Sequence, residues 1–209
     1  SLLECLKKVA YDQFYCEHIY VFSTLALKNI LNKFNFEIFD IENVNTHGGS
    51  NRYFIKKRDN RFYKISANVK KEISKEIRFG LNKFSTYKKF EKKVLNSKKK
   101  LLQIIKKLKN KKLKIIGYGA TAKSCTVLNY CGIGKQDIDY FLDTTSYKIN
   151  KFLPGSKILI KKYKKFSLNN VDVVYLGAWN FKDEIFKKEK KFINEGGKFI
   201  THIPLPKII

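Results

Sequence analysis

No stretch of this sequence is apolar for long enough to cross a membrane, since a spanning helix needs about 20 consecutive apolar residues. The first residues also lack the basic start and apolar core of a secretory signal. Cysteine is scarce, and Cys5, Cys16, Cys125 and Cys131 form no Cys-x-x-Cys pair, which excludes the usual zinc spacing. We therefore expect reduced thiols in a cytoplasmic protein that has no metal site in these residues and no membrane partner.

Arginine is also rare, although the net charge is +26. Only four of the 44 basic residues are arginine, namely Arg52, Arg58, Arg61 and Arg78. Nucleic-acid readers favour arginine for its bidentate fork. The lysines accompany abundant Ile, Asn, Tyr and Phe, a composition typical of A/T-rich coding. This predicts a solvated, lysine-rich surface and no nucleic-acid partner, while the positive field would attract an anionic substrate.

Hydrophobic spacing divides the first part of the chain into short elements. Residues 1–10 are predicted to form a short helix or turn, and the aromatic and β-branched residues of 11–23 a strand that runs into a loop. A helix over residues 24–36 and an alternating strand over 36–44 follow. A strand, a helix and a strand cannot bury their apolar faces alone. Residues 1–45 are therefore expected to be the last part of a larger α/β domain.

The segment 46–112 is predicted to add one strand and a long helical region. Residues 51–57 resume an extended pattern after a glycine turn, and residues 68–108 are helical in character, with a break at Gly80. Lysines cover the outer face of the helical stretch after Gly80. This pattern is also compatible with a helix that lies on a membrane surface. We favour the solvated face of a packed helix, because a strand that needs covering follows directly.

Strands and helices alternate regularly from residue 113 to residue 209. Apolar strands that alternate with helices indicate a parallel sheet covered on both faces, so this part is predicted to be a Rossmann-like α/β unit. The predicted strands are residues 112–120, 138–143, 157–160, 171–179 and 198–204, and the predicted helices are residues 121–133 and 183–197.

The stretch GYGATAKS opens a helix directly after a strand. Gly117 and Gly119 would let a phosphate approach the backbone, with Lys123 near a diphosphate and Asp143 on ribose hydroxyls, as in a dinucleotide enzyme. The third glycine of that fingerprint is absent, so the motif is only weak evidence for an NAD site. The alternative is a tight strand-to-helix turn with no ligand.

Four further side chains are candidates for a structural or a functional role. Trp179, which follows a strand, either stacks on a base or fills the edge of the core, and His202 is expected to be structural. Glu17 and His18 stand side by side in YDQFYCEHIY. They are either packed at the end of a strand or form the acid/base centre of an enzyme.

Seven stretches occur in an order that resembles one family. They are YDQFYCEHIYVFS, THGGSNR, GYGATAK, NYCGIG, FLPG, WNF and GGKFITHIPLP. This order is similar to that of the sugar-nucleotide C-methyltransferases, which use S-adenosylmethionine to methylate a carbon of a keto-deoxyhexose on a nucleoside diphosphate. The resemblance implies that residues 46–209 are the C-terminal domain of such an enzyme. It also implies that a zinc-binding domain and most of the donor site lie outside this chain, which alone should be inactive.

The resemblance also implies roles for individual residues. His18 matches the base that removes a proton next to the ketone, Glu17 would orient it, and Tyr15 would hold the enolate oxygen. Cys16 departs from the family motif, which usually has a histidine there. The residues expected to line the substrate site are His47, Ser50, Gly117, Gly119, Ala120, Lys123 and Asn129. A sugar-nucleotide-binding module without catalysis and a nicotinamide-dependent oxidoreductase remain the alternatives.

Overall fold

A computed structural model describes residues 1–164 and 167–209, apart from the side chain of His47. The described residues form two compact units. One comprises residues 1–10 and 18–93, and the other residues 11–17 and 94–209. The predicted domain boundary between residues 1–45 and 46–209 remains a prediction.

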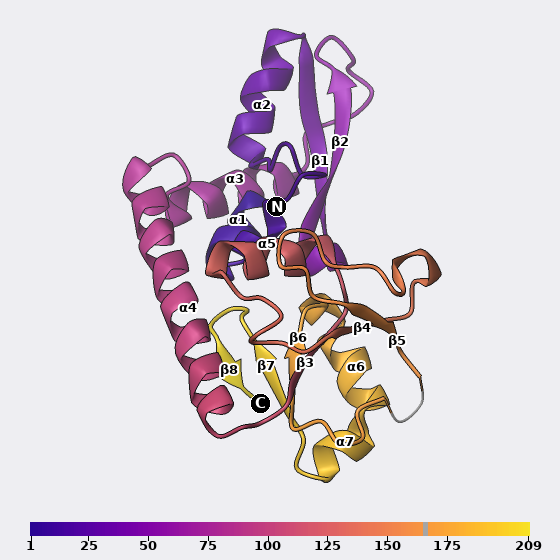
Figure 1. The fold of residues 1–209 in the computed structure, drawn as a ribbon. Helices are drawn as coiled ribbons and strands as arrows, with labels where there is room; N and C mark the ends of the chain where they lie inside the picture. The colour runs from indigo at the N-terminus through magenta and orange to yellow at the C-terminus, as the bar shows by residue number, and fades with distance from the viewer. Residues whose placement is uncertain (165–166) are drawn as a thin grey trace. The chain divides into compact units, whose positions relative to one another are not determined.

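The first unit is a two-stranded antiparallel sheet with helices (Figure 1). Its elements are α1 (Leu2–Lys7), α2 (Thr24–Lys33), β1 (Phe36–Val44), the short 3-10 helix η2 (Thr46–Gly48), β2 (Ser50–Lys57) and α3 (Ala67–Phe79). Ile38 and Ile41 of β1 pack with Val69 of α3. Gly80 ends α3 in the left-handed conformation, with φ of 88°, as the predicted helix break requires. The following helix, α4 (Phe84–Asn110), begins in this unit and ends in the second.

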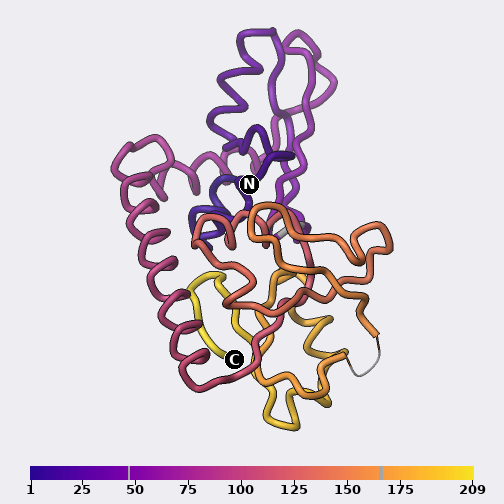
Figure 2. The backbone as a smooth tube through the Cα atoms, viewed as in Figure 1, coloured from indigo at the N-terminus to yellow at the C-terminus, as the bar shows by residue number. Residues whose placement is uncertain are grey.

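The second unit is built on a six-stranded sheet (Figure 1), and Figure 2 shows the path of the backbone by residue number. The strands run in the order β5-β4-β3-β6-β7-β8, and all neighbours are parallel except β7 and β8. This confirms the predicted α/β, Rossmann-like fold. The strands are β3 (Ile115–Tyr118), β4 (Phe141–Asp143), β5 (Ile160–Lys162), β6 (Val173–Leu176), β7 (Lys198–Thr201) and β8 (Lys207–Ile208). The helices are α5 (Ala122–Cys131), α6 (Lys182–Lys188) and α7 (Lys190–Asn194), with the 3-10 helices η1 (Tyr11–Gln13), η3 (Ser146–Lys148) and η4 (Trp179–Phe181).

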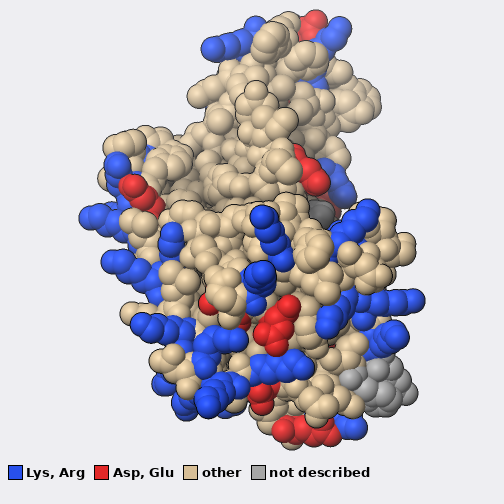
Figure 3. Space-filling model, in the orientation of Figure 1, with Lys and Arg blue, Asp and Glu red and all other residues tan. Residues whose placement is uncertain are grey.

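The central strands β3 and β6 are buried throughout, as continuous apolar runs in a covered parallel sheet should be. The core against them includes Leu142, Ile185 and Phe199. The lysines lie mainly outside, and Figure 3 shows Lys and Arg side chains spread across the visible face, with fewer Asp and Glu between them. Among the described residues, no helix is both long and apolar enough to span a membrane.

Three local predictions are wrong. The strand predicted over 11–23 is the short helix η1 followed by irregular chain, because no strand among the described residues pairs with it. The helix predicted over 183–197 is divided at Glu189 into α6 and α7. The strand predicted over 157–160 begins only at Ile160, because Ile158 before it accepts the backbone N–H of Leu153 instead of pairing in the sheet.

Candidate functional site at the carboxyl ends of the strands

A cavity of about 330 Å³ lies where β3, β4 and β6 end. In parallel α/β sheets this edge is where ligands bind, because the strand ends and helix starts leave backbone groups and side chains converging there. Its lining combines aromatic rings, two lysines and two carboxylates. The lining residues are Tyr118, Gly119, Thr121, Leu142, Asp143, Thr144, Thr145, Lys148, Tyr163, Ala178, Phe181, Glu184, Ile185 and Lys188.

Asp143 binds the loop that follows β3. Its Oδ2 accepts the Ala120 N–H at 2.8 Å, and its Oδ1 accepts the Thr145 N–H at 2.8 Å. Lys148 donates to the Ala120 carbonyl at 2.9 Å, with its Nζ 3.9 Å from Asp143. The amide that a dinucleotide diphosphate would use is thus occupied by a carboxylate of this chain. Asp143 is engaged with backbone and is not aimed at ribose hydroxyls, which disfavours the NAD interpretation.

The opposite wall of the cavity carries an aromatic ring with a cation against it. The Nζ of Lys188 lies 3.7 Å from the centre of the Tyr163 ring. The Tyr118 hydroxyl donates to Glu189 at 3.1 Å. Burial, and then the negative charge of Glu189, raise the pKa of Tyr118 far above its ordinary value. Partial burial followed by hydrogen bonding with Glu189 raises the pKa of Tyr163 to about 12. Both hydroxyls therefore stay protonated at neutral pH.

Gly117 and Gly119 make room for this chain's own residues. A Cβ on Gly117 would lie 2.4 Å from the Phe141 ring, and one on Gly119 would lie 2.5 Å from Cβ of Ala178. Gly119 also has φ of 85°, in the left-handed region. Thr121 caps α5 by accepting the Ser124 N–H at 3.1 Å. The two glycines are thus explained by packing and turn geometry, while their predicted contact with substrate is not tested.

Two other predicted substrate residues have partners within the fold. Lys123 is 6% exposed, and its Nζ lies 5.1 Å from the centre of the Trp179 ring. Asn129 donates to the Pro154 carbonyl at 3.1 Å and so fixes the turn at Gly155. Neither lines the cavity.

The predicted residues of the THGGS turn belong to the first unit. Ser50 donates to the Thr46 carbonyl at 3.1 Å, across the short helix η2. The side chain of His47 lies outside the described residues. Their predicted place in a substrate cleft remains a prediction.

The three predicted catalytic residues follow one another in irregular chain after η1. Tyr15 is half-buried, Glu17 is exposed, and His18 is half-buried. Tyr15 and Glu17 belong to the second unit and His18 to the first. Partial burial and then the negative charge of Glu17 raise the pKa of Tyr15, so its hydroxyl keeps its proton at neutral pH and can donate.

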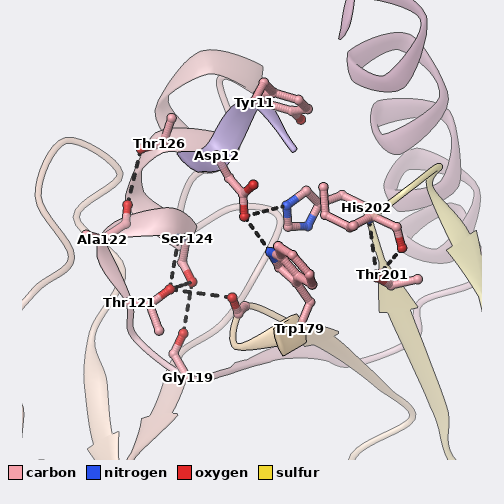
Figure 4. A network of polar contacts seen from close by, with 12 residues as sticks. Tyr11, Asp12, Gly119, Thr121, Ala122, Ser124, Thr126, Trp179, Thr201 and His202 are labelled. Atoms are coloured by element: carbon pink, nitrogen blue, oxygen red, sulfur yellow. Dashed lines mark hydrogen bonds and ion pairs between the residues drawn. The ribbon is translucent and has the colours of Figure 1, made fainter. Parts of the chain in front are cut away.

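Sequence reasoning missed Asp12, which is fully buried just before these residues. Figure 4 shows its carboxylate between Trp179 and His202. Trp179 Nε1 donates to Asp12 Oδ2 at 2.5 Å, and His202 Nε2 lies 3.2 Å from the same oxygen. Trp179 therefore packs at the edge of the core, and the complete burial of His202 agrees with a structural role. The signal in the sequence was an aspartate inside the most distinctive motif of the chain.

The glycine loop after β3 does not fit a methyl-donor site. Within the described part of the second unit, the glycine loop that ends β3 is closed by Asp143 and by close packing. No group of three or more potential metal ligands occurs among the described residues. We therefore assign the donor to no residue of this chain.

Comparison with known proteins decides the family. Residues 45–204 match the family model described as the C-methyltransferase C-terminal domain. The chain belongs to the C-methyltransferase family. It is also 30% identical over 208 residues to C-methyltransferase NovU from Streptomyces niveus, a match that covers 100% of this chain and 49% of NovU. The chain thus spans about half the length of the curated relative it matches.

Proposed function

We propose that the chain is the C-terminal part of an S-adenosylmethionine-dependent, cytoplasmic C-methyltransferase that acts on a nucleoside-diphosphate-linked keto-deoxyhexose. The observation that carries the proposal is the cavity at the carboxyl ends of β3, β4 and β6, in a chain of this family. Its mixture of cations, aromatic rings and carboxylates matches the three parts of a sugar nucleotide. The substrate class comes from the resemblance of the ordered motifs.

Each part of such a substrate has a chemically suited partner in the cavity. The lysines Lys148 and Lys188 can neutralise a diphosphate, and the exposed ring of Phe181 offers a flat apolar surface to a base. Glu184 can accept hydrogen bonds from sugar hydroxyls. The net charge of +26 would speed the arrival of the anionic ligand.

The chemical roles are proposed for the segment after η1. His18 takes the proton from the carbon next to the ketone, because a neutral imidazole is a competent base near pH 7. Glu17 orients this imidazole and stabilises its charged form. The protonated Tyr15 hydroxyl donates to the developing enolate oxygen. The bound donor supplies the methyl group from a site outside these residues.

Two alternatives keep a specific place. A sugar-nucleotide-binding module without catalysis would use the same cavity and differ only at His18. A nicotinamide-dependent enzyme would need the loop amide of Ala120, which Asp143 already occupies. The first alternative is separated from the proposal by measuring proton removal.

The test is solvent deuterium exchange into the keto sugar nucleotide, followed by proton NMR, with the longer enzyme that contains these residues. We expect exchange at the carbon next to the ketone even without methyl donor, because His18 acts before methyl transfer. His18→Asn should lower the exchange rate at least about 100-fold, the usual contribution of a general base. An unchanged rate in this variant would remove His18 from the proposed role, and no exchange in the unmodified enzyme would favour the binding module.

A further inference from the structure

The segment Tyr11–Glu17 changes from buried to exposed within a few residues. Tyr11, Asp12 and Gln13 are 6%, 0% and 5% exposed, whereas Cys16 and Glu17 are exposed. All of them belong to the second unit. The proposed chemical residues thus follow directly on a buried stretch of chain.

Asp12 is the charged centre of that buried stretch. A carboxylate without solvent is costly unless donors surround it. The indole N–H of Trp179 supplies one donor at 2.5 Å, and His202 Nε2 lies 3.2 Å from the same oxygen (Figure 4). Trp179 follows β6 and His202 follows β7, so Asp12 is bound at the ends of two neighbouring sheet strands.

His202 has a second buried partner, Tyr175, at its other ring nitrogen. The Tyr175 hydroxyl is 3.1 Å from Nδ1 of His202. Burial raises the pKa of Tyr175 well above its ordinary value, so Tyr175 keeps its proton and can donate it to Nδ1. Because Tyr175, His202 and Asp12 are each 0% exposed, these three side chains hold a position and do not reach a substrate.

Tyr11 provides a second, independent hold on the segment. Its hydroxyl lies 3.8 Å from Sγ of Cys131 at the end of α5, and its ring centre lies 5.5 Å from that of Tyr130. The ring of Tyr11 also meets His202 edge-on, with centres 6.1 Å apart. The buried stretch is thus attached to α5 as well as to the sheet.

We propose that Asp12 is a positioning residue, which fixes Tyr15 and Glu17 for the reaction by anchoring their segment to Trp179 and His202. Tyr15 is three residues from Asp12, and three residues of fully extended chain reach at most about 10 Å. A fixed Asp12 therefore restricts where the Tyr15 hydroxyl and the Glu17 carboxylate can go. This inference rests on the proposed function for the roles of Tyr15 and Glu17, but the anchoring itself is measured without any ligand.

The test is hydrogen–deuterium exchange of the backbone amides 14–17 in the 209-residue chain, together with fluorescence of Trp179, its only tryptophan. Asp12→Asn replaces a charged acceptor by a weaker one, so these amides should exchange about 10- to 100-fold faster. The emission of Trp179 should shift to longer wavelength. Trp179→Phe keeps an aromatic ring but removes the donor, so it should also accelerate exchange. This second variant serves as the test if Asp12→Asn does not fold.

Ile138→Ala is the matched control, because Ile138 is 0% exposed in the same unit and its apolar side chain can neither donate nor accept a hydrogen bond in this network. It should lower the global stability while leaving the exchange rates of amides 14–17 unchanged. If Asp12→Asn and Trp179→Phe leave the exchange of these amides unchanged, or if Ile138→Ala accelerates it equally, the proposal is wrong. In the methylating enzyme, Asp12→Asn should lower kcat about tenfold with KM changed less than about twofold. A loss in KM alone would also overturn it, whereas an enzyme that methylates nothing would refute the proposed function and leave the exchange result standing.

Discussion

Packing contacts determine which residues can occupy the loop after β3 and the first turn of α5. The sequence predicts that Gly117 and Gly119 form either a phosphate site or a tight strand-to-helix turn. Both occupy positions where an added Cβ would clash with a neighbour. The reason is contact with Phe141 and Ala178, partners whose proximity the sequence does not reveal. Lys123 illustrates the same limit, because nothing in its sequence context indicates that Trp179 would cover it.

Gly119→Ala tests the packing at that loop. The substitution combines a strained left-handed backbone with a Cβ 2.5 Å from Ala178, so it should lower the free energy of unfolding by about 2–5 kcal/mol. Gly132→Ala is the matched control, with φ of 72° and no atom within 4 Å of its added Cβ, and should cost only about 1–2 kcal/mol. Urea denaturation followed by circular dichroism measures both. Equal losses would mean that the Ala178 contact carries no cost.

Local sequence signals predict helices and strands more reliably than they predict the side chains that cap the helices. The buried runs of β3 and β6, and the helical spacing of α2, α3 and α5, were readable because periodicity reports burial directly. The segment 11–23 was misread, since aromatic residues favour strands only where a partner strand is present. The antiparallel strand β8 is only two residues long and carried no detectable pattern.

The N-terminus of α2 depends on a residue from another helix. Fully buried Glu76 of α3 accepts the N–H groups of Thr24 at 2.7 Å and Leu25 at 2.9 Å, while Ser23 accepts that of Ala26 at 3.1 Å. These bonds satisfy the first three amides of α2, which have no partner inside their helix. Such a cap, made 52 residues away from Thr24 in sequence, could not be predicted.

Glu76→Gln should lower the free energy of unfolding by about 1–3 kcal/mol, because one oxygen is replaced by an amide that cannot accept a backbone N–H. The control is Glu91→Gln on α4, whose side chain is 58% exposed and pairs with Lys88, with an expected change below about 0.5 kcal/mol. Thermal unfolding at pH 7 compares the two. Similar melting temperatures in both variants would contradict the capping role.

The whole molecule combines a lysine-rich surface with tyrosines whose hydroxyls are buried. The sequence indicated the first through its counts of Lys and Arg, and the alternation of elements indicated the parallel sheet. It did not indicate which tyrosines would be enclosed. Tyr11, Tyr118 and Tyr175 all have a pKa raised primarily by burial.

These tyrosines predict a loss of stability at alkaline pH. Each pKa is higher in the folded chain than in the unfolded chain, so the stabilisation is complete below the unfolded value of about 10 and is lost as pH rises above it. The urea midpoint should therefore fall as the pH rises above about 10. Tyr118→Phe removes one of these groups and should show a shallower fall than the unmodified chain. Parallel slopes would show that Tyr118 does not titrate with unfolding.

Binding by the 209-residue chain tests the central claim most directly. In titration calorimetry a thymidine diphosphate sugar should bind, and S-adenosylmethionine and NAD should not. Lys188→Ala, at the cavity, should weaken that binding about tenfold, as loss of a charge-assisted contact does, whereas Lys99→Ala, which makes the same charge change on exposed α4, should leave it unchanged. Sugar-nucleotide binding that is absent or equally affected by both substitutions, or binding of NAD or the methyl donor, would contradict the account.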